Sequence, residues 1–268
     1  MVIWELSTIF VRMRIFKSIW QILNYKTLIV TVLSVASTWF CYNYQLTADF
    51  PLTLVGISIV FPIVFSISSA YNRRERALQH LASFKAHSVA LHHASRDWIK
   101  IPEAKFEDRL KSHLTGLFED LRKLFIAKRE EQKDAELQIY KRIDSLSEIL
   151  QEFRTLGLAS SEMSRVDQFL SKMIIDLENM KMILHYRTPV TLRAYSKVFI
   201  YSFPILYGPY FAYTETLYAH YLEYVLPILF SFILVSLDNI QEHLENPFDQ
   251  VGEDDVRLEI QELEMMMV

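Results

Sequence analysis

Hydrophobic residues along the chain gather in four blocks that carry almost no charge. The blocks span residues 27–42, 52–70, 198–213 and 222–237, and Glu223 is their only charged member. Each is about as long as a helix must be to cross ~30 Å of hydrocarbon. Buried core helices of a soluble protein are the alternative, but four such blocks would overfill the core of a chain of 268 residues. The pattern therefore predicts a membrane protein with four transmembrane helices.

The charges beside these blocks indicate how the chain is oriented. The connections at residues 43–51 and 214–221 contain no Lys or Arg. Basic residues lie before the first block, after the second and before the third: Arg12, Arg14, Lys17, Lys26, Arg73, Arg74, Arg76, Arg187, Arg193 and Lys197. Because cytoplasmic loops carry the excess of Lys and Arg, we expect both termini and the long middle segment in the cytoplasm. The cell (inner) membrane is the expected location.

The middle segment, residues 72–197, has a helical pattern throughout. It holds 23 of the 28 basic residues, and its apolar residues recur at steps of three and four, as in amphipathic helices. The three stripes are Leu110, Leu114, Leu117, Leu121 and Leu124; Tyr140, Ile143, Leu146 and Leu150; and Phe169, Met173, Leu177 and Met180. Breaks are expected at Ile101-Pro102, residues 128–134 and residues 157–161. The segment is thus expected to form a bundle of about four helices, some of them continuing membrane helices.

The expected fold class is all-α, a polytopic membrane protein with a cytoplasmic helical bundle. Its regions are an amphipathic interfacial helix (1–26), transmembrane helices 1 and 2 (27–71, the second at 52–70), the cytoplasmic helical domain (72–197), transmembrane helices 3 and 4 (198–237) and an acidic cytoplasmic segment (238–268).

Composition and motifs exclude several other classes of protein. Five glycines disfavour Gly-rich phosphate loops, and a single cysteine excludes a disulfide framework. A net charge of −4 gives no reason to expect a nucleic-acid partner. The sequence has no P-loop, HExxH motif or nucleophile elbow, so we expect no enzyme activity. His80 and His87, one heptad apart, and the His92-His93 pair are interpreted as surface or packing residues rather than ligands.

The second block presents one face of large apolar residues. Ile57, Phe61 and Phe65 are four residues apart, so they drift only slowly around a helix and share a face. Rings of such residues from several subunits would form an apolar constriction, which is one way in which channels gate. Spacing alone favours the simpler alternative, that these side chains pack against neighbouring helices.

From Asp238 onward the tail contains ten acidic residues and one Arg. Its simplest interpretation is a solvated surface. Alternatively, Asn246-Pro247-Phe248 forms a turn that is followed by Glu253, Asp254 and Asp255 as oxygen donors, the type of ligand that Ca²⁺ prefers.

Three stretches of the sequence resemble the bestrophin family of ion channels, including its bacterial branch. The second block runs into Ala70-Tyr71-Asn72-Arg73-Arg74-Glu75-Arg76, and His185-Tyr186-Arg187-Thr188-Pro189-Val190 precedes the third block. The most specific stretch is Leu237-Asp238-Asn239-Ile240 followed by Glu245-Asn246-Pro247-Phe248 and Asp254-Asp255-Val256. Their order and spacing are similar to the family along nearly the whole chain.

This resemblance implies a homopentamer, embedded in membrane lipids, in which five second helices surround a central pore. The family's apolar neck would fall on Ile57, Phe61 and Phe65, and its cytoplasmic aperture near Thr188. The permeant ions would be chloride or other monovalent anions, with monovalent cations as an alternative. A membrane-anchored helical scaffold or sensor that does not conduct ions is the alternative from another functional class.

The resemblance also implies a Ca²⁺ clasp at Asn246, Asp254 and Asp255. The sequence departs from the family here, because Asp249 replaces the usual glycine and Val251-Gly252 stands where an acidic ligand is expected. A structural loop against the N-terminal segment is the alternative, and no cofactor is required for the channel itself.

Overall fold

The computed structural model describes residues 24–49, 51–101, 103–217, 222–250 and 255–268, and these residues form helices without any β-strand. The helices are α2 (Tyr25–Asn43), α3 (Leu52–Asp97), α4 (Ala104–Ile126), α5 (Gln132–Thr155), α6 (Ser160–His185), α7 (Val190–Leu206), α8 (Gly208–Leu217), α9 (Leu222–Glu245) and α10 (Ile260–Met266). The expected all-α class is therefore confirmed. The helix predicted at residues 1–26 lies almost entirely outside the described residues.

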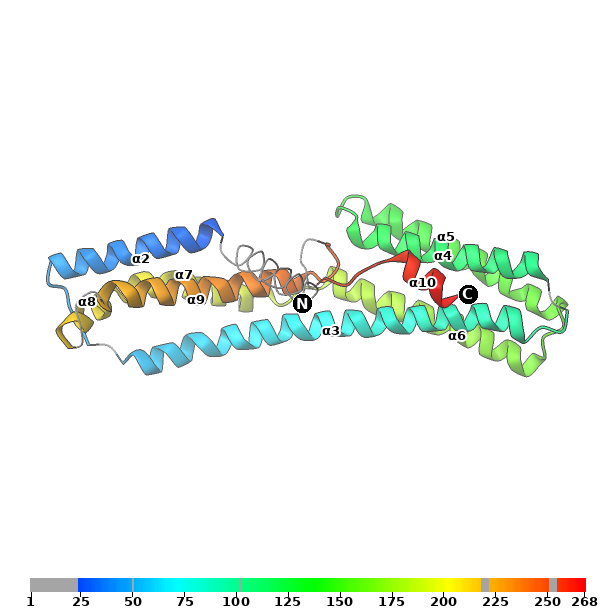
Figure 1. Cartoon of the computed structure of the whole chain (residues 1–268), viewed down its shortest axis with the longest axis horizontal. Helices are drawn as coiled ribbons and strands as arrows, with labels where there is room; N and C mark the ends of the chain where they lie inside the picture. Colours follow the sequence, from blue (N-terminus) through cyan, green and yellow to red (C-terminus); the bar gives the residue numbers. More distant parts are fainter. Residues whose placement is uncertain (1–23, 50, 102, 218–221, 251–254) are drawn as a thin grey trace, which may run out of the picture. The chain divides into compact units, whose positions relative to one another are not determined.

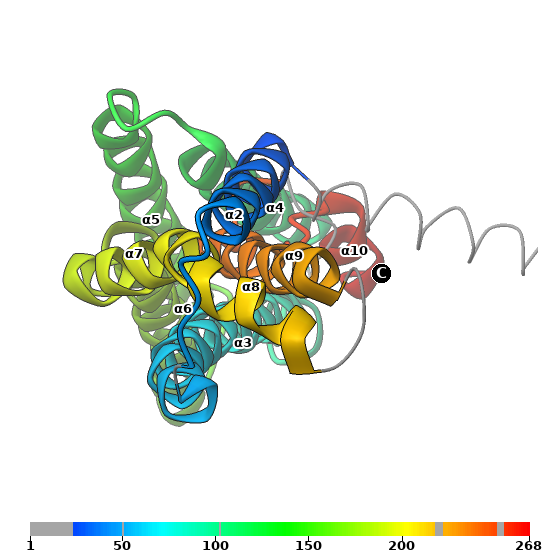
Figure 2. The same ribbon diagram turned by 90° about the vertical axis from the view of Figure 1, so that its left-hand side faces the viewer.

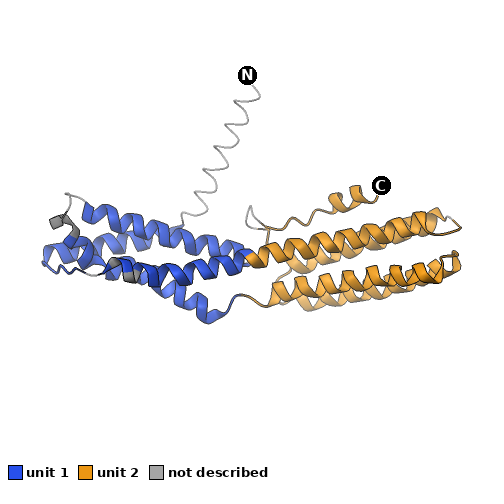
Figure 3. Cartoon of the chain, turned by 90° about the horizontal axis from the view of Figure 1, so that it is seen from below, with its two compact units in different colours: residues 1–71, 188–245 blue, residues 72–187, 246–268 orange. Residues whose placement is uncertain are grey.

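The chain forms two compact units (Figure 3). Unit 1 comprises residues 1–71 and 188–245, and unit 2 comprises residues 72–187 and 246–268. The boundary falls within α3, which therefore contributes its first part to unit 1 and the remainder to unit 2.

Unit 1 is built from α2, α7, α8, α9 and the first part of α3. Figures 1 and 2 both show α2, α8 and α9 side by side. The apolar cluster at the centre of the unit consists of Val30, Ile59, Ile63, Ile200, Phe203, Tyr207, Phe211, Leu234 and Val235. By length and composition, α9 is the one helix among the described residues that could cross a membrane.

The third hydrophobic block is not the single helix that its pattern predicts. α7 ends at Leu206 and α8 begins at Gly208, so the block at residues 198–213 is divided in two. Pro209 contributes to the break, because proline has no N–H and cannot donate to the carbonyl four residues earlier. The missing donor is not enough alone, since α3 continues through Pro62 and α9 through Pro227. Proline is tolerated in the first turn of a helix, where α8 places it.

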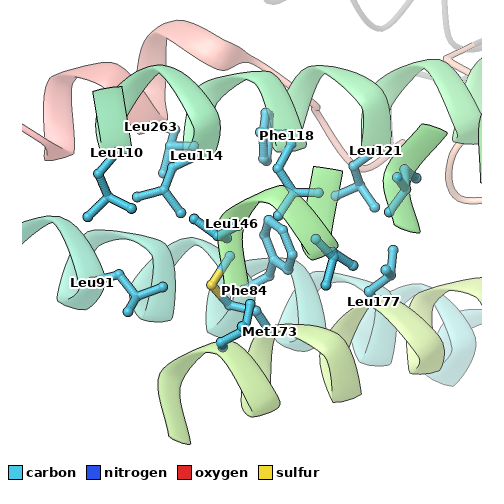
Figure 4. Close-up of a cluster of buried hydrophobic side chains, with 14 of the residues drawn as sticks. Phe84, Leu91, Leu110, Leu114, Phe118, Leu121, Leu146, Met173, Leu177 and Leu263 are labelled. Carbon is cyan, nitrogen blue, oxygen red and sulfur yellow. The ribbon is translucent and has the colours of Figure 1, made fainter. Parts of the chain in front are cut away.

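Unit 2 is a helical bundle with a continuous apolar core. Figure 4 shows Phe84 and Leu91 of α3 in one apolar cluster with leucines of α4 and with Met173 and Leu177 of α6. The stripe Leu110, Leu114, Leu117, Leu121 and Leu124 is buried completely or nearly so, as its spacing predicts.

The helix ends in unit 2 agree with the sequence, whereas one residue of a predicted stripe does not. The breaks near residues 101–102, 128–134 and 157–161 are confirmed, because they lie between α3, α4, α5 and α6. Tyr140 belongs to the second of the predicted apolar stripes, but its side chain is 38% exposed. Its hydroxyl donates to Glu178 and accepts from Lys181 at 2.6 Å. Partial burial and the bond to Glu178 raise the pKa of Tyr140.

Candidate functional site

The first part of α3 has one buried face and one open face. Ile59 and Ile63 lie in the core of unit 1 and are only 2% and 1% exposed. On the other side, Ile57, Phe61 and Phe65 are 50%, 58% and 61% exposed. Val60 and Val64 extend the open face and are also exposed.

The helix itself is continuous through Pro62, so the open residues lie along an unbroken stretch. The rings of Phe61 and Phe65 are neighbours, with centroids 6.0 Å apart. The described helices of this chain therefore leave these side chains uncovered. A large exposed apolar face requires lipid or further protein to cover it.

Thr188, the predicted aperture residue, lies in the turn between α6 and α7. Its side chain is 4% exposed, and its hydroxyl has no hydrogen-bond partner among the described residues. Tyr186 and Val190, two residues before and two residues after Thr188, are exposed. Arg73 of α3 caps the C-terminal end of α6. Its guanidinium donates to the carbonyl of Tyr186 and, at 2.5 Å, to the carbonyl of Ile183. The role of Thr188 at an aperture stays a prediction.

The Asn246-Pro247-Phe248 turn is anchored to unit 2 through its aromatic ring. Phe248 is completely buried and stacks on Phe125 of α4, with centroids 4.1 Å apart and planes 12° apart. The backbone N–H of Val256 donates to the carbonyl of Pro247 at 2.8 Å and closes the loop. The motif therefore has a structural function in attaching the C-terminal segment to α4.

The described residues of this loop do not by themselves make a Ca²⁺ site. The amide of Asn246 donates to the carboxylate of Asp249 at 3.0 Å. Asp254 lies outside the described residues, and among the residues that are described no group of three or more acidic, His or Cys side chains could hold a metal ion. The clasp of Asn246, Asp254 and Asp255 stays a prediction.

The end of α9 carries a polar layer that the sequence did not reveal. Lys26 of α2 and Lys197 of α7 both bind the carboxylate of Glu242, the former at 2.9 Å. Arg193 of α7 binds Glu245 at 3.1 Å. Three of the basic residues that indicate orientation, Lys26, Arg193 and Lys197, therefore also join α2, α7 and α9.

Two further contacts complete this polar layer. The hydroxyl of Tyr201 donates to Asp238 at 2.6 Å, and the amide of Asn24 donates to Asn239 at 2.8 Å. Asn24 also caps α2, because its side chain accepts from the backbone N–H groups of Lys26 and Thr27. Asp238, Glu242 and Glu245 lie at steps of four and three along α9. This spacing could have indicated the polar layer, but the simplest interpretation of the acidic tail is a solvated surface.

The histidines of α3 join it to its neighbours. His80 and His87 both face Asp176 of α6, with nitrogen–oxygen distances of 3.0 and 3.6 Å. The interpretation of these histidines as packing residues agrees with this arrangement.

Comparison with known proteins adds information on the fold. No protein-family model matches the chain, and no curated protein matches its sequence. A crystal structure of a bacterial bestrophin homologue from Klebsiella pneumoniae matches with a TM-score of 0.76 at 17% identity, covering 91% of this chain and 96% of that chain. A single-substitution variant of the homologue matches with a TM-score of 0.77 at 18% identity, covering 90% and 97%.

The chain has the bestrophin fold. A further structure, described as that of a membrane protein, matches with a TM-score of 0.76 at 18% identity over 91% of this chain and 96% of that one. The resemblance in three short stretches of sequence is thus confirmed across almost the whole chain. At this low identity the likeness concerns the bestrophin fold alone.

Proposed function

We propose that the chain is one subunit of a bestrophin-like pentameric ion channel. Five copies of the first part of α3 would surround a central axis and direct Ile57, Phe61 and Phe65 toward it as an apolar neck. Small monovalent ions would pass through this neck, with chloride and other anions favoured. The proposed role is conduction rather than catalysis.

The observation that supports this proposal most strongly is the open apolar face of α3 in a chain with the bestrophin fold. The opposite face is already buried in unit 1 through Ile59 and Ile63. Rings of bulky apolar side chains can close a channel by excluding water. Lipid alone could cover the same face, so the proposal depends on the assembly of several copies.

The proposal includes four membrane spans in unit 1, with both termini in the cytoplasm of the cell (inner) membrane. α2, the first part of α3, α7 with α8, and α9 would form these spans. The cations that join the polar layer, Lys26, Arg193 and Lys197, would then lie near the cytoplasmic surface. This placement agrees with the excess of Lys and Arg on that side of membrane proteins.

Ion flux into liposomes tests the proposed channel. The purified protein should dissipate a chloride gradient across the liposome membrane. Phe61→Ala or Phe65→Ala should increase the chloride flux several-fold, because a smaller side chain widens the neck and lets water enter it. Phe40→Ala is the control, since Phe40 is a half-exposed phenylalanine on α2. This control should leave the flux unchanged.

Background flux in the wild type and in both α3 variants would contradict the channel and favour a non-conducting scaffold or sensor. If flux is present, the reversal potential in asymmetric NaCl identifies the permeant ion, because anion and cation pores shift it in opposite directions.

A further inference from the structure

Asp238 of α9 is a buried carboxylate that forms no ion pair with a described residue. Its side chain is 0% exposed. One oxygen accepts the hydrogen bond from Tyr201 at 2.6 Å, whereas Oδ1 has no hydrogen-bond partner in the described part of the chain. None of the ion pairs of the polar layer includes Asp238. Lys26 acts on Asp238 electrostatically, but its ammonium group is bonded to Glu242.

Two other oxygens on the same face of α9 are also buried and unpaired. Gln241 and Glu245 follow Asp238 by three and seven residues, a spacing that places all three on one side of a helix. Oε1 of Gln241 and Oε1 of Glu245 have no hydrogen-bond partner, and both side chains are more than nine-tenths buried. The negative charge of Glu245 is matched by Arg193 at 3.1 Å. The charge of Asp238 is the one left unmatched among these residues.

A buried, unpaired carboxylate destabilises the folded protein unless a positive charge lies close to it. Hard cations bind carboxylate and amide oxygens, which are the donors that Asp238 and Gln241 offer here. A divalent ion would leave an excess positive charge, since one carboxylate is unmatched. We propose that Asp238 Oδ1 and Gln241 Oε1 bind a hard monovalent cation, such as Na⁺, beside α9. This site goes beyond the proposed channel and does not require conduction.

Thermal unfolding of the purified full chain tests the site, with Na⁺ as the probe. At pH 8 the protein should unfold at a higher temperature in NaCl than in N-methylglucamine chloride of equal ionic strength, because a ligand that binds the folded state stabilises it. Asp238→Asn should abolish the response or raise the Na⁺ concentration at half effect by about tenfold or more. Glu119→Gln is the control and should keep the response, since it removes an exposed carboxylate of α4 that is paired with Lys123 at 3.4 Å.

Gln241→Met is the second variant, in case Asp238→Asn does not fold. It removes one oxygen at similar volume and should weaken the response to Na⁺. Equal responses to Na⁺ in the wild type, Asp238→Asn and Gln241→Met would overturn the proposal. So would a wild type whose unfolding temperature is the same in NaCl and in N-methylglucamine chloride. Flux measured on the Phe61 and Phe65 variants separates failure of this site from failure of the channel.

Discussion

His92 of α3 is almost completely buried, and its Nε2 lies 3.4 Å from the carboxylate of Glu107. Its Nδ1 has no hydrogen-bond partner among the described residues. Burial lowers the pKa of His92 below its ordinary value and outweighs the opposing effect of Glu107. Protonation therefore favours the unfolded chain, in which the imidazole has its ordinary pKa of about 6.5.

This single residue should make the protein less stable in mild acid. The stabilisation that neutral His92 provides is complete above its ordinary pKa and is lost as the pH falls from there through the lowered folded-state value. We expect His92→Gln to reduce the fall in melting temperature between pH 7.5 and pH 5.5. His93→Gln, at the adjacent and less buried position, should keep that fall. An identical fall in the wild type and both variants would assign the acid sensitivity to other groups.

At the scale of elements, α2 compensates for the break between α7 and α8. The carbonyl of Ile205 has no helical donor, because the residue four positions later is Pro209. The hydroxyl of Ser37 on α2 donates to it at 2.7 Å. This bond requires close approach, and a Cβ atom on Gly208 would lie 3.1 Å from the backbone carbonyl carbon of Ser37.

Gly208→Ala should therefore separate α2 from α8 and destabilise the protein by about 1–3 kcal/mol, the usual cost of overpacking. Thermal or denaturant unfolding measures this effect. Gly56→Ala is the matched control, because a Cβ atom there meets no other atom within 4 Å. Since alanine favours a helix over glycine, this control should be neutral or slightly stabilising. A Gly208→Ala protein as stable as the wild type would show that the two helices adjust without cost.

At the scale of the whole molecule, the open face of α3 must be covered by lipid or by further protein. In the proposed assembly that protein is the same face of further copies around one axis. Native mass spectrometry in detergent should find a protein mass five times the 31.6 kDa of one chain. A species of one chain at micromolar protein concentration would contradict the pentamer and, with it, the neck.

Much of the helical structure could be predicted from local sequence. The leucine stripe of α4 and the ends of α4, α5 and α6 follow from periodicity and from breakers such as Pro102, which act within a few residues. The same local rules failed at Tyr140, because a tyrosine can satisfy a helical stripe and still turn its hydroxyl toward charged neighbours. They also missed the division of the third block, although Gly208-Pro209 was a sufficient signal.

The sequence by itself determined that the chain is helical, where most helices end and which residues share a face, since these depend on neighbours one or two turns away. Only the tertiary structure decided that the face of Ile57, Phe61 and Phe65 is left uncovered. It also decided that Lys26 and Lys197 meet at Glu242, and that Asp238 is buried without an ion pair among the described residues. Such facts depend on which distant helices pack together, and the packing of α2 and α7 on α9 brings together residues up to 216 positions apart.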